Sequence, residues 1–168
     1  MGRVLRAVWQ RRSINDQVKG RLFEAFVSSV FLYNSEVWPL RPEELKRLKA
    51  AYSDMVIQLA RMGGKLRGRV KMKLTDALAA VGLPELEALL TQKRLRWVGH
   101  ALRREEGDAS KAAVLHKLQT NREGTWAQLV WGDMETMGWQ DVEELQAAAV
   151  DNRAQFKRTT DALLRGAP

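Results

Sequence analysis

Cysteine is missing from this chain of 168 residues, and no apolar run approaches the length of a membrane span. Without cysteine the chain can form no disulfide, and a transition-metal site would have to be built around His100 or His116. A membrane-spanning helix needs about 18 or more apolar residues in succession, so we expect no membrane contact. The lack of thiols is typical of proteins in a reducing compartment and favours an intracellular location.

Paired carboxylates of the kind used in two-metal catalysis are also missing. The sequence contains no Asp-Asp or Asp-x-Asp pair that could hold two Mg²⁺ ions. A lone Asp54 occurs in a helical pattern, where we expect it to face water. Gly63-Gly64-Lys65 lacks both the upstream glycine and the following Ser or Thr of a phosphate-binding loop. We therefore expect a non-catalytic protein with no metal, no cofactor and no small-molecule substrate.

Positive charge is plentiful but unevenly distributed. The formal net charge is +8, yet residues 1–104 carry 21 Lys and Arg against 9 Asp and Glu, whereas residues 105–168 carry 7 against 11. We therefore predict a basic helical region, 1–104, and a small acidic helical region, 105–168, packed as one unit. The basic region favours a polyanion as partner. The acidic, tryptophan-containing region favours packing or contact with other protein subunits.

Helical periodicity runs along most of the chain and predicts an all-α bundle of about seven or eight helices. The expected ends of these helices carry typical capping residues. We expect helices to start at Ser13 or Asn15, at Pro42, at Thr75 with Asp76, at Pro84, at Thr125 and at Asp141. We expect helices to end at Gly63, Gly82 and Gly138. The apolar face of the second helix is expected to contain Val18, Leu22, Phe23, Phe26, Val27, Val30 and Phe31.

The first 15 residues are rich in arginine and contain no acidic residue. This composition resembles a mitochondrial presequence, which leaves a mitochondrial location open. The alternative is an ordinary first helix of the fold, and we favour it.

One segment departs from the helical period. Between Gly64 and Thr75, cations alternate with apolar residues or glycine, and a period of two predicts an extended basic arm. Five cations without an acidic neighbour repel one another unless an anion is close, so we expect the arm to contact phosphates. The alternative is a solvated loop. The predicted contacts in this arm are Lys65, Arg67, Arg69, Lys71 and Lys73.

A second basic element is the helix expected over residues 85–104. At 100° per residue its cations fall on one stripe, and Leu95, Val98, Ala101 and Leu102 form a separate apolar arc. A helix of this kind packs through one side and offers cations on the other, which suits a polyanion. The predicted nucleic-acid contacts on it are Lys93, Arg96, Trp97, His100, Arg103 and Arg104.

Three residues in this helix have more specific interpretations. Trp97 lies at the border of the arc and the stripe, so it either packs in the core or stacks on a base. His100 has no nearby Ser, Cys or Asp with which to form a nucleophile–base set, so we expect it to bond phosphate or backbone. Gly99 permits the close approach of another element.

The stretch KRLRWVGHALRR, residues 93–104, resembles the segment RRLRW-x-GH-x-xR of reverse transcriptases from non-LTR (LINE-type) retrotransposons. Residues 19–38 are similar to that family's K-x-x-LF-x-x-x-V-x-x-x-LLYGSE-x-W. Asn34 stands where the family usually has Gly, and a left-handed turn tolerates Asn nearly as well. Glu36 in this motif is expected to be structural, in an ion pair or as a helix cap.

The resemblance continues through the rest of the chain. Gly82-Leu83-Pro84 followed by Leu86 resembles the family's GLP-x-L. Thr125-Trp126 with Asp133, and then Phe156-Lys157-Arg158, resemble its final helices. The motifs occur in order over residues 17–165 and match only the part of the enzyme that lies after the catalytic palm. The family's cysteine-containing zinc knuckle has no counterpart.

This resemblance implies a bundle like a reverse-transcriptase thumb, without the polymerase. The leading hypothesis is a non-catalytic, structural RNA-binding protein derived from this retrotransposon region. Such a protein would be a subunit of a large ribonucleoprotein such as a ribosome. It would hold RNA through contacts with the RNA backbone. Other protein subunits would contact the C-terminal tryptophan-rich region. Two alternatives remain, a protein–protein scaffold subunit and a detached fragment of an active reverse transcriptase.

Overall fold

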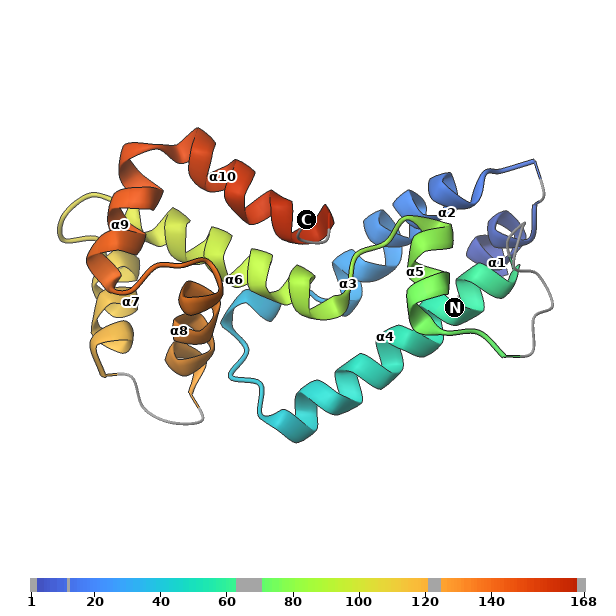
Figure 1. Ribbon diagram of the computed structural model, residues 1–168, viewed down its shortest axis with the longest axis horizontal. Coiled ribbons are helices and arrows are strands. Elements are labelled where there is room, and N and C mark those ends of the chain that lie inside the picture. Colours follow the sequence, from blue (N-terminus) through green and yellow to red (C-terminus); the bar gives the residue numbers. More distant parts are fainter. Residues whose placement is uncertain (1–2, 12, 63–70, 121–124, 166–168) are drawn as a thin grey trace. The chain divides into compact units, whose positions relative to one another are not determined.

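The computed structural model describes residues 3–11, 13–62, 71–120 and 125–165, and all regular elements within these ranges are helical (Figure 1). The all-α prediction is therefore confirmed for the described residues. The chain forms two compact units: Met1–Tyr33 with Glu43–Leu86, and Asn34–Pro42 with Glu87–Pro168. The sequence placed the boundary at residue 104, where the charge changes. The units divide near residue 86 instead, because the helix that begins there packs with the C-terminal helices.

The first unit contains α1 (Arg3–Gln10), α2 (Asp16–Phe23), the π-helical turn η1 (Glu24–Ser28), α3 (Ser29–Phe31), most of α4 (Pro42–Met62) and α5 (Leu74–Val81). Trp9, Phe23, Tyr52 and Leu59 are among its fully buried side chains. The rings of Phe23 and Tyr52 meet edge to face, with their centroids 6.4 Å apart. The Tyr52 hydroxyl donates a hydrogen bond to the Pro84 carbonyl at 2.9 Å, which ties α4 to the residues after α5.

Several predicted helix ends are confirmed. Asn15 caps α2, because its side chain accepts a hydrogen bond from the Gln17 amide at 2.8 Å. Gly82 ends α5 at φ +66°, a left-handed conformation that favours glycine. The predicted start of α5 was wrong: the helix begins at Leu74, with Lys73 at the cap position. Thr75 and Asp76 lie in its first turn, where the Asp76 charge stabilises the positive end of the helix dipole.

The predicted apolar face of residues 18–31 is only partly correct, since its first residue, Val18, is 44% exposed. Phe23 is fully buried, but Phe26 is 59% exposed and Val30 is 75% exposed. The cause is η1, whose π-helical turn adds a residue and rotates the later residues around the helix axis. Ser28 and Leu32 therefore face inward in place of the predicted residues.

α2 and α5 approach closely in the first unit. A Cβ atom added at Gly20 would lie 1.9 Å from the Val81 carbonyl oxygen, so only glycine permits this backbone contact. The neighbouring Lys19 is also buried, and its ammonium pairs with Asp16 at 3.4 Å. The exposed Asp54 lies on α4, in agreement with the sequence prediction.

The second unit is a helical bundle built around one central helix. Its elements are η2 (Ser35–Val37), α6 (Leu86–Leu102), α7 (Ala109–Thr120), α8 (Trp126–Thr136), α9 (Val142–Asp151), α10 (Arg153–Ala162) and η3 (Leu163–Arg165). The predicted apolar arc of α6 is confirmed, because Leu95, Val98, Ala101 and Leu102 are each at most 2% exposed. They pack against buried residues from α7 to α10. The Asp141 side chain caps α9 as predicted, since it accepts a hydrogen bond from the Glu144 amide at 2.7 Å.

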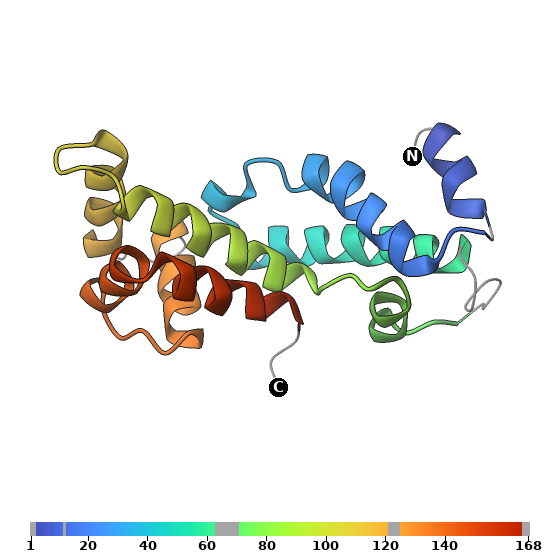
Figure 2. The ribbon, with the colours of Figure 1, turned by 90° about the horizontal axis from the view of Figure 1, so that it is seen from above.

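α10 runs alongside α6 in both ribbon views (Figures 1 and 2). Its Phe156 ring rests on Gly99, and a Cβ atom at Gly99 would lie 2.5 Å from a carbon of that ring. Phe156 cannot easily move aside, because it is buried and stacks on Trp139 with ring centroids 5.5 Å apart. The sequence prediction that Gly99 permits close approach is therefore confirmed, and the approaching element is α10.

A buried ion pair joins α6 to α8. Arg94 donates from Nε to Asp133 Oδ2 at 2.6 Å and from Nη2 to Oδ1 at 2.8 Å. Thr91 also donates to Asp133, at 2.7 Å. The side chains of Arg94 and Asp133 are only 8% and 7% exposed. The planar guanidinium fixes the distance between α6 and α8 and the rotation of α8 about its axis, because both hydrogen bonds from Arg94 to Asp133 depend on direction.

Replacing Gly99 should test the contact with Phe156. We expect Gly99→Ala to be less stable than Gly132→Ala by about 1–3 kcal/mol, the usual cost of overpacking. Gly132 is the matched control, since a Cβ there meets nothing within 4 Å and both changes favour the helix equally. Urea unfolding followed by circular dichroism measures the difference. Equal stabilities would contradict the proposed clash.

Removing Asp133 should reveal the cost of an unpaired buried charge. Asp133→Ala leaves the Arg94 guanidinium without its partner, and we expect a loss of about 3–5 kcal/mol in the free energy of unfolding. The double change Arg94→Met with Asp133→Leu removes both charges and should recover much of that loss. A double variant as unstable as the single one would show that shape, rather than charge, governs this contact.

Candidate nucleic-acid interface

A groove of about 190 Å³ in the second unit, between α6 and α10, concentrates cationic side chains. We call it the basic groove, and its lining residues are Arg96, Arg103, Arg153, Phe156 and Lys157. Arg96 lies on α6 and Arg103 directly follows its last residue, seven positions later, whereas Arg153 and Lys157 are one turn apart on α10. These spacings place each pair on one face of its helix. The contact between Gly99 and Phe156 brings the two faces together.

Hydrogen bonds orient Arg96 and Arg103. Arg96 Nη2 pairs with Asp161 Oδ1 at 2.5 Å, and the Gln92 amide donates to the same oxygen at 2.7 Å. Arg103 Nη1 donates to the Ala149 carbonyl at 3.1 Å, near the end of α9. Its guanidinium carbon lies 6.0 Å from the centroid of the Phe156 ring, within the range of a cation–π contact.

The groove carries an excess of positive charge. Four cationic side chains line it, and the Asp161 carboxylate pairs with one of them. Burial lowers the pKa of the Arg103 guanidinium from its ordinary value, and the charge of Arg153 lowers it further. An anion in the groove would offset the repulsion between these positively charged side chains. A phosphate suits such a site, because arginine binds phosphate oxygens through paired, charge-assisted hydrogen bonds.

The other residues predicted on the basic stripe lie elsewhere. Lys93 is half-buried and lies 3.9 Å from Glu36, in the ion pair expected for that carboxylate. His100 and Arg104 are exposed on and just after α6. Trp97 is half-buried, with its ring edge-on to Trp126 at 5.4 Å between centroids. The structure therefore brings Arg96 and Arg103 together, while Lys93 and Trp97 contact other parts of the unit.

The predicted basic arm lies only partly within the described residues. Lys65, Arg67 and Arg69 are outside them. Lys71 and Lys73 are exposed in the first unit, and Lys73 has the extended conformation φ −75°, ψ 147° before α5. Residues 71–73 belong to neither a helix nor a strand. The contact role of the arm therefore stays a prediction.

Two residues of the groove were missed from the sequence. Arg153 and Lys157 lie in the region whose net charge is negative, and this charge favours packing or protein contact for the region as a whole. Their spacing of four residues on one helix was a detectable signal, and Lys157 lies within the Phe156-Lys157-Arg158 motif. Arg94, on α6 beside the predicted contact Lys93, has a structural role, because it pairs with the buried Asp133.

Two further observations concern metal binding and membrane-spanning helices. Among the described residues, no group of three or more His, Cys, Asp or Glu side chains could hold a metal ion. None of the helices described is long and apolar enough to cross a membrane.

Trp97 allows packing and RNA contact to be separated. We expect Trp97→Ala to cost about 3 kcal/mol of stability, near the lower end for buried tryptophan, because the indole packs against Trp126. A base-stacking role would instead leave stability unchanged and cost about 1–3 kcal/mol in binding single-stranded RNA. Thermal melting together with RNA titration distinguishes the two. An unchanged melting midpoint with lost affinity would contradict the packing role.

No protein-family model matches the chain, and neither the curated proteins nor the solved structures contain a significant match to it. The resemblance to LINE-type reverse transcriptases therefore rests on the sequence motifs alone. The case for a nucleic-acid interface rests on the residues of the basic groove itself.

Proposed function

We propose that this chain is a non-catalytic RNA-binding protein that holds the RNA backbone in the basic groove. The convergence of four cationic side chains, from α6, the residue that follows it and α10, carries this proposal. Contacts of this kind recognise phosphate and not base, so they supply affinity without sequence choice. The resemblance of the sequence motifs to reverse transcriptases supports RNA as the polyanion.

The groove is suited to an RNA backbone for three reasons. Arg96 and Arg103 are held in place by Asp161 and the Ala149 carbonyl, so little side-chain entropy is lost on binding. Arg153 and Lys157 are exposed and can meet a phosphate directly. The hollow of about 190 Å³ is small and matches a phosphate and its sugar better than a folded polypeptide.

The wider assembly is part of the same proposal. The arm residues Lys65, Arg67, Arg69, Lys71 and Lys73 would add phosphate contacts. The protein would be an intracellular, structural subunit of a large ribonucleoprotein such as a ribosome, descended from the region of a retrotransposon reverse transcriptase that lies after the palm. It would lack polymerase and nuclease activity in the presence of Mg²⁺.

A second candidate function, a scaffold that joins protein subunits, is favoured by one observation. An open hollow of about 910 Å³ in the second unit is lined by two half-buried tryptophans, Trp131 and Trp139. Aromatic side chains of this kind are enriched where proteins meet. Glu135 gives this surface a negative charge, which distinguishes it from the basic groove. The two functions are compatible in a ribonucleoprotein subunit.

Neutralising one groove arginine should weaken RNA binding and its dependence on salt. We expect Arg153→Gln to lower affinity for every RNA sequence alike and to reduce the log–log salt slope by about 0.7, the value for one phosphate contact on a single strand. Filter binding at several salt concentrations measures both quantities.

Arg158→Gln is the matched control. Arg158 is exposed on the same helix and loses the same charge, but it bonds Gln155 and does not line the groove. We expect it to change the salt slope much less. Equal effects of the two variants would show that net charge, and not the groove, determines binding. A flat salt response in the unaltered protein would overturn RNA binding in favour of the scaffold.

A further inference from the structure

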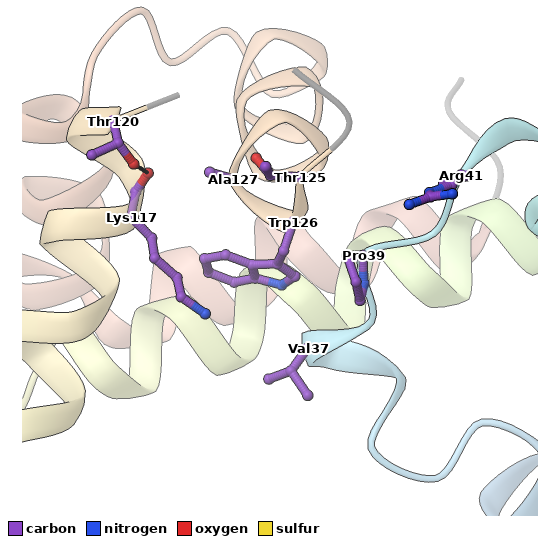
Figure 3. A pocket seen from close by; sticks show the side chains of 8 residues that line it. All are labelled: Val37, Pro39, Arg41, Lys117, Thr120, Thr125, Trp126 and Ala127. Carbon is purple, nitrogen blue, oxygen red and sulfur yellow. Dashed lines mark hydrogen bonds between the residues drawn. The ribbon is translucent and has the colours of Figure 1, made fainter. Parts of the chain in front are cut away.

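A separate pocket of about 380 Å³ lies elsewhere in the second unit, where η2 and the residues after it meet α7 and α8 (Figure 3). Its lining residues are Val37, Pro39, Arg41, Lys117, Thr120, Thr125, Trp126 and Ala127. None of them belongs to the basic groove. The pocket volume is near the lower end of small-ligand sites, which span about 300–1,000 Å³.

A long-range hydrogen bond builds this pocket. The Trp126 indole donates from Nε1 to the Glu36 carbonyl at 2.6 Å and so joins the start of α8 to η2. Val37 and Pro39 come soon after Glu36 in the chain and form one wall. Lys117 Nζ lies 5.9 Å from the centroid of the Trp126 ring, a cation–π contact that places the ammonium over the indole.

The lining combines three kinds of chemistry. Val37, Pro39, Trp126 and Ala127 supply apolar surface, and the threonine hydroxyls supply hydrogen-bonding groups. Lys117 and Arg41 supply positive charge, and none of the eight lining residues described is acidic. In Figure 3 the Trp126 indole lies between the side chains of Lys117 and Arg41. The pocket therefore suits a ligand with an apolar, hydrogen-bonding body and negative charge on both sides.

We infer that this pocket holds one unstacked nucleotide of a bound RNA strand, an inference that rests on the proposed function. The base packs against the apolar wall, and the Thr120 and Thr125 side chains line the pocket beside its polar edge. A nucleotide within a strand carries a phosphate on each side, and Lys117 and Arg41 meet these two charges. Single-stranded RNA offers such splayed bases to protein pockets. The basic groove then holds the backbone, and the pocket holds one base.

Binding of uridine 3′,5′-bisphosphate to the full-length protein, measured by calorimetry, tests the pocket independently of the RNA strand. We expect the bisphosphate to bind about tenfold more tightly than uridine 5′-monophosphate, because one more charged contact forms. Lys117→Gln and Arg41→Gln should each weaken bisphosphate binding about tenfold. Both side chains are exposed, and melting curves check that the variants fold.

Arg158→Gln is the control for the pocket, because Arg158 loses the same charge and lines neither the pocket nor the groove. It should leave bisphosphate affinity unchanged, whereas Lys117→Gln should weaken binding of both the bisphosphate and a long RNA. Bisphosphate binding that is absent, or indifferent to Lys117→Gln, would overturn the nucleotide pocket.

The RNA titration separates the inference from the proposed function. If long RNA binds and depends on Arg153 but not on Lys117 or Arg41, the pocket inference fails and RNA binding in the groove stands. If the bisphosphate binds but no RNA does, the pocket is a site for free nucleotides, and both the RNA function and the inference drawn from it fail.

Discussion

The contact between Gly99 and Phe156 is the constraint on which the candidate interface depends. The missing side chain at Gly99 lets the aromatic ring rest on the α6 backbone, and the stacked Trp139 holds that ring in place. This contact determines how close α10 lies to α6. Because Arg153 and Lys157 flank Phe156 on α10, the same contact brings them to Arg96 and Arg103. A packing requirement therefore creates the local concentration of positive charge.

Two arginines of α6, only two residues apart, have opposite roles. Arg94 is buried and makes a paired hydrogen bond to Asp133, whereas Arg96 is exposed and pairs with Asp161 at the groove. A step of two residues turns a helix by about 200°, so neighbouring cations face different surroundings. Buried charge is tolerated at Arg94 because Asp133 and Thr91 complete its hydrogen bonds. Charge density in the sequence alone therefore overstates the cations available to a ligand.

The second unit combines two surfaces of similar charge and different shape. The basic groove is small, lined mostly by charged groups, and suits a repeated phosphate backbone. The pocket beside Trp126 is larger and has an apolar wall, so it suits one compact group. The central helix α6 serves both, since Arg96 lines the groove and Trp97 packs on the indole that lines the pocket. Damage to the core of this unit would therefore affect both surfaces.

The amino-acid sequence by itself determined the local features: the all-helical fold, the cap at Asn15, the left-handed turns at Asn34 and Gly82, and the apolar arc of α6. These features depend on residues within about one turn of each other, which a linear pattern records. Only the tertiary structure decided the partners of the cations, the outward rotation of Phe26 within the π-helical turn and of Val30 after it, and the division into units near residue 86. These depend on which helix faces meet, and residues such as Arg103 and Arg153, 50 positions apart, come together only when Phe156 packs on Gly99.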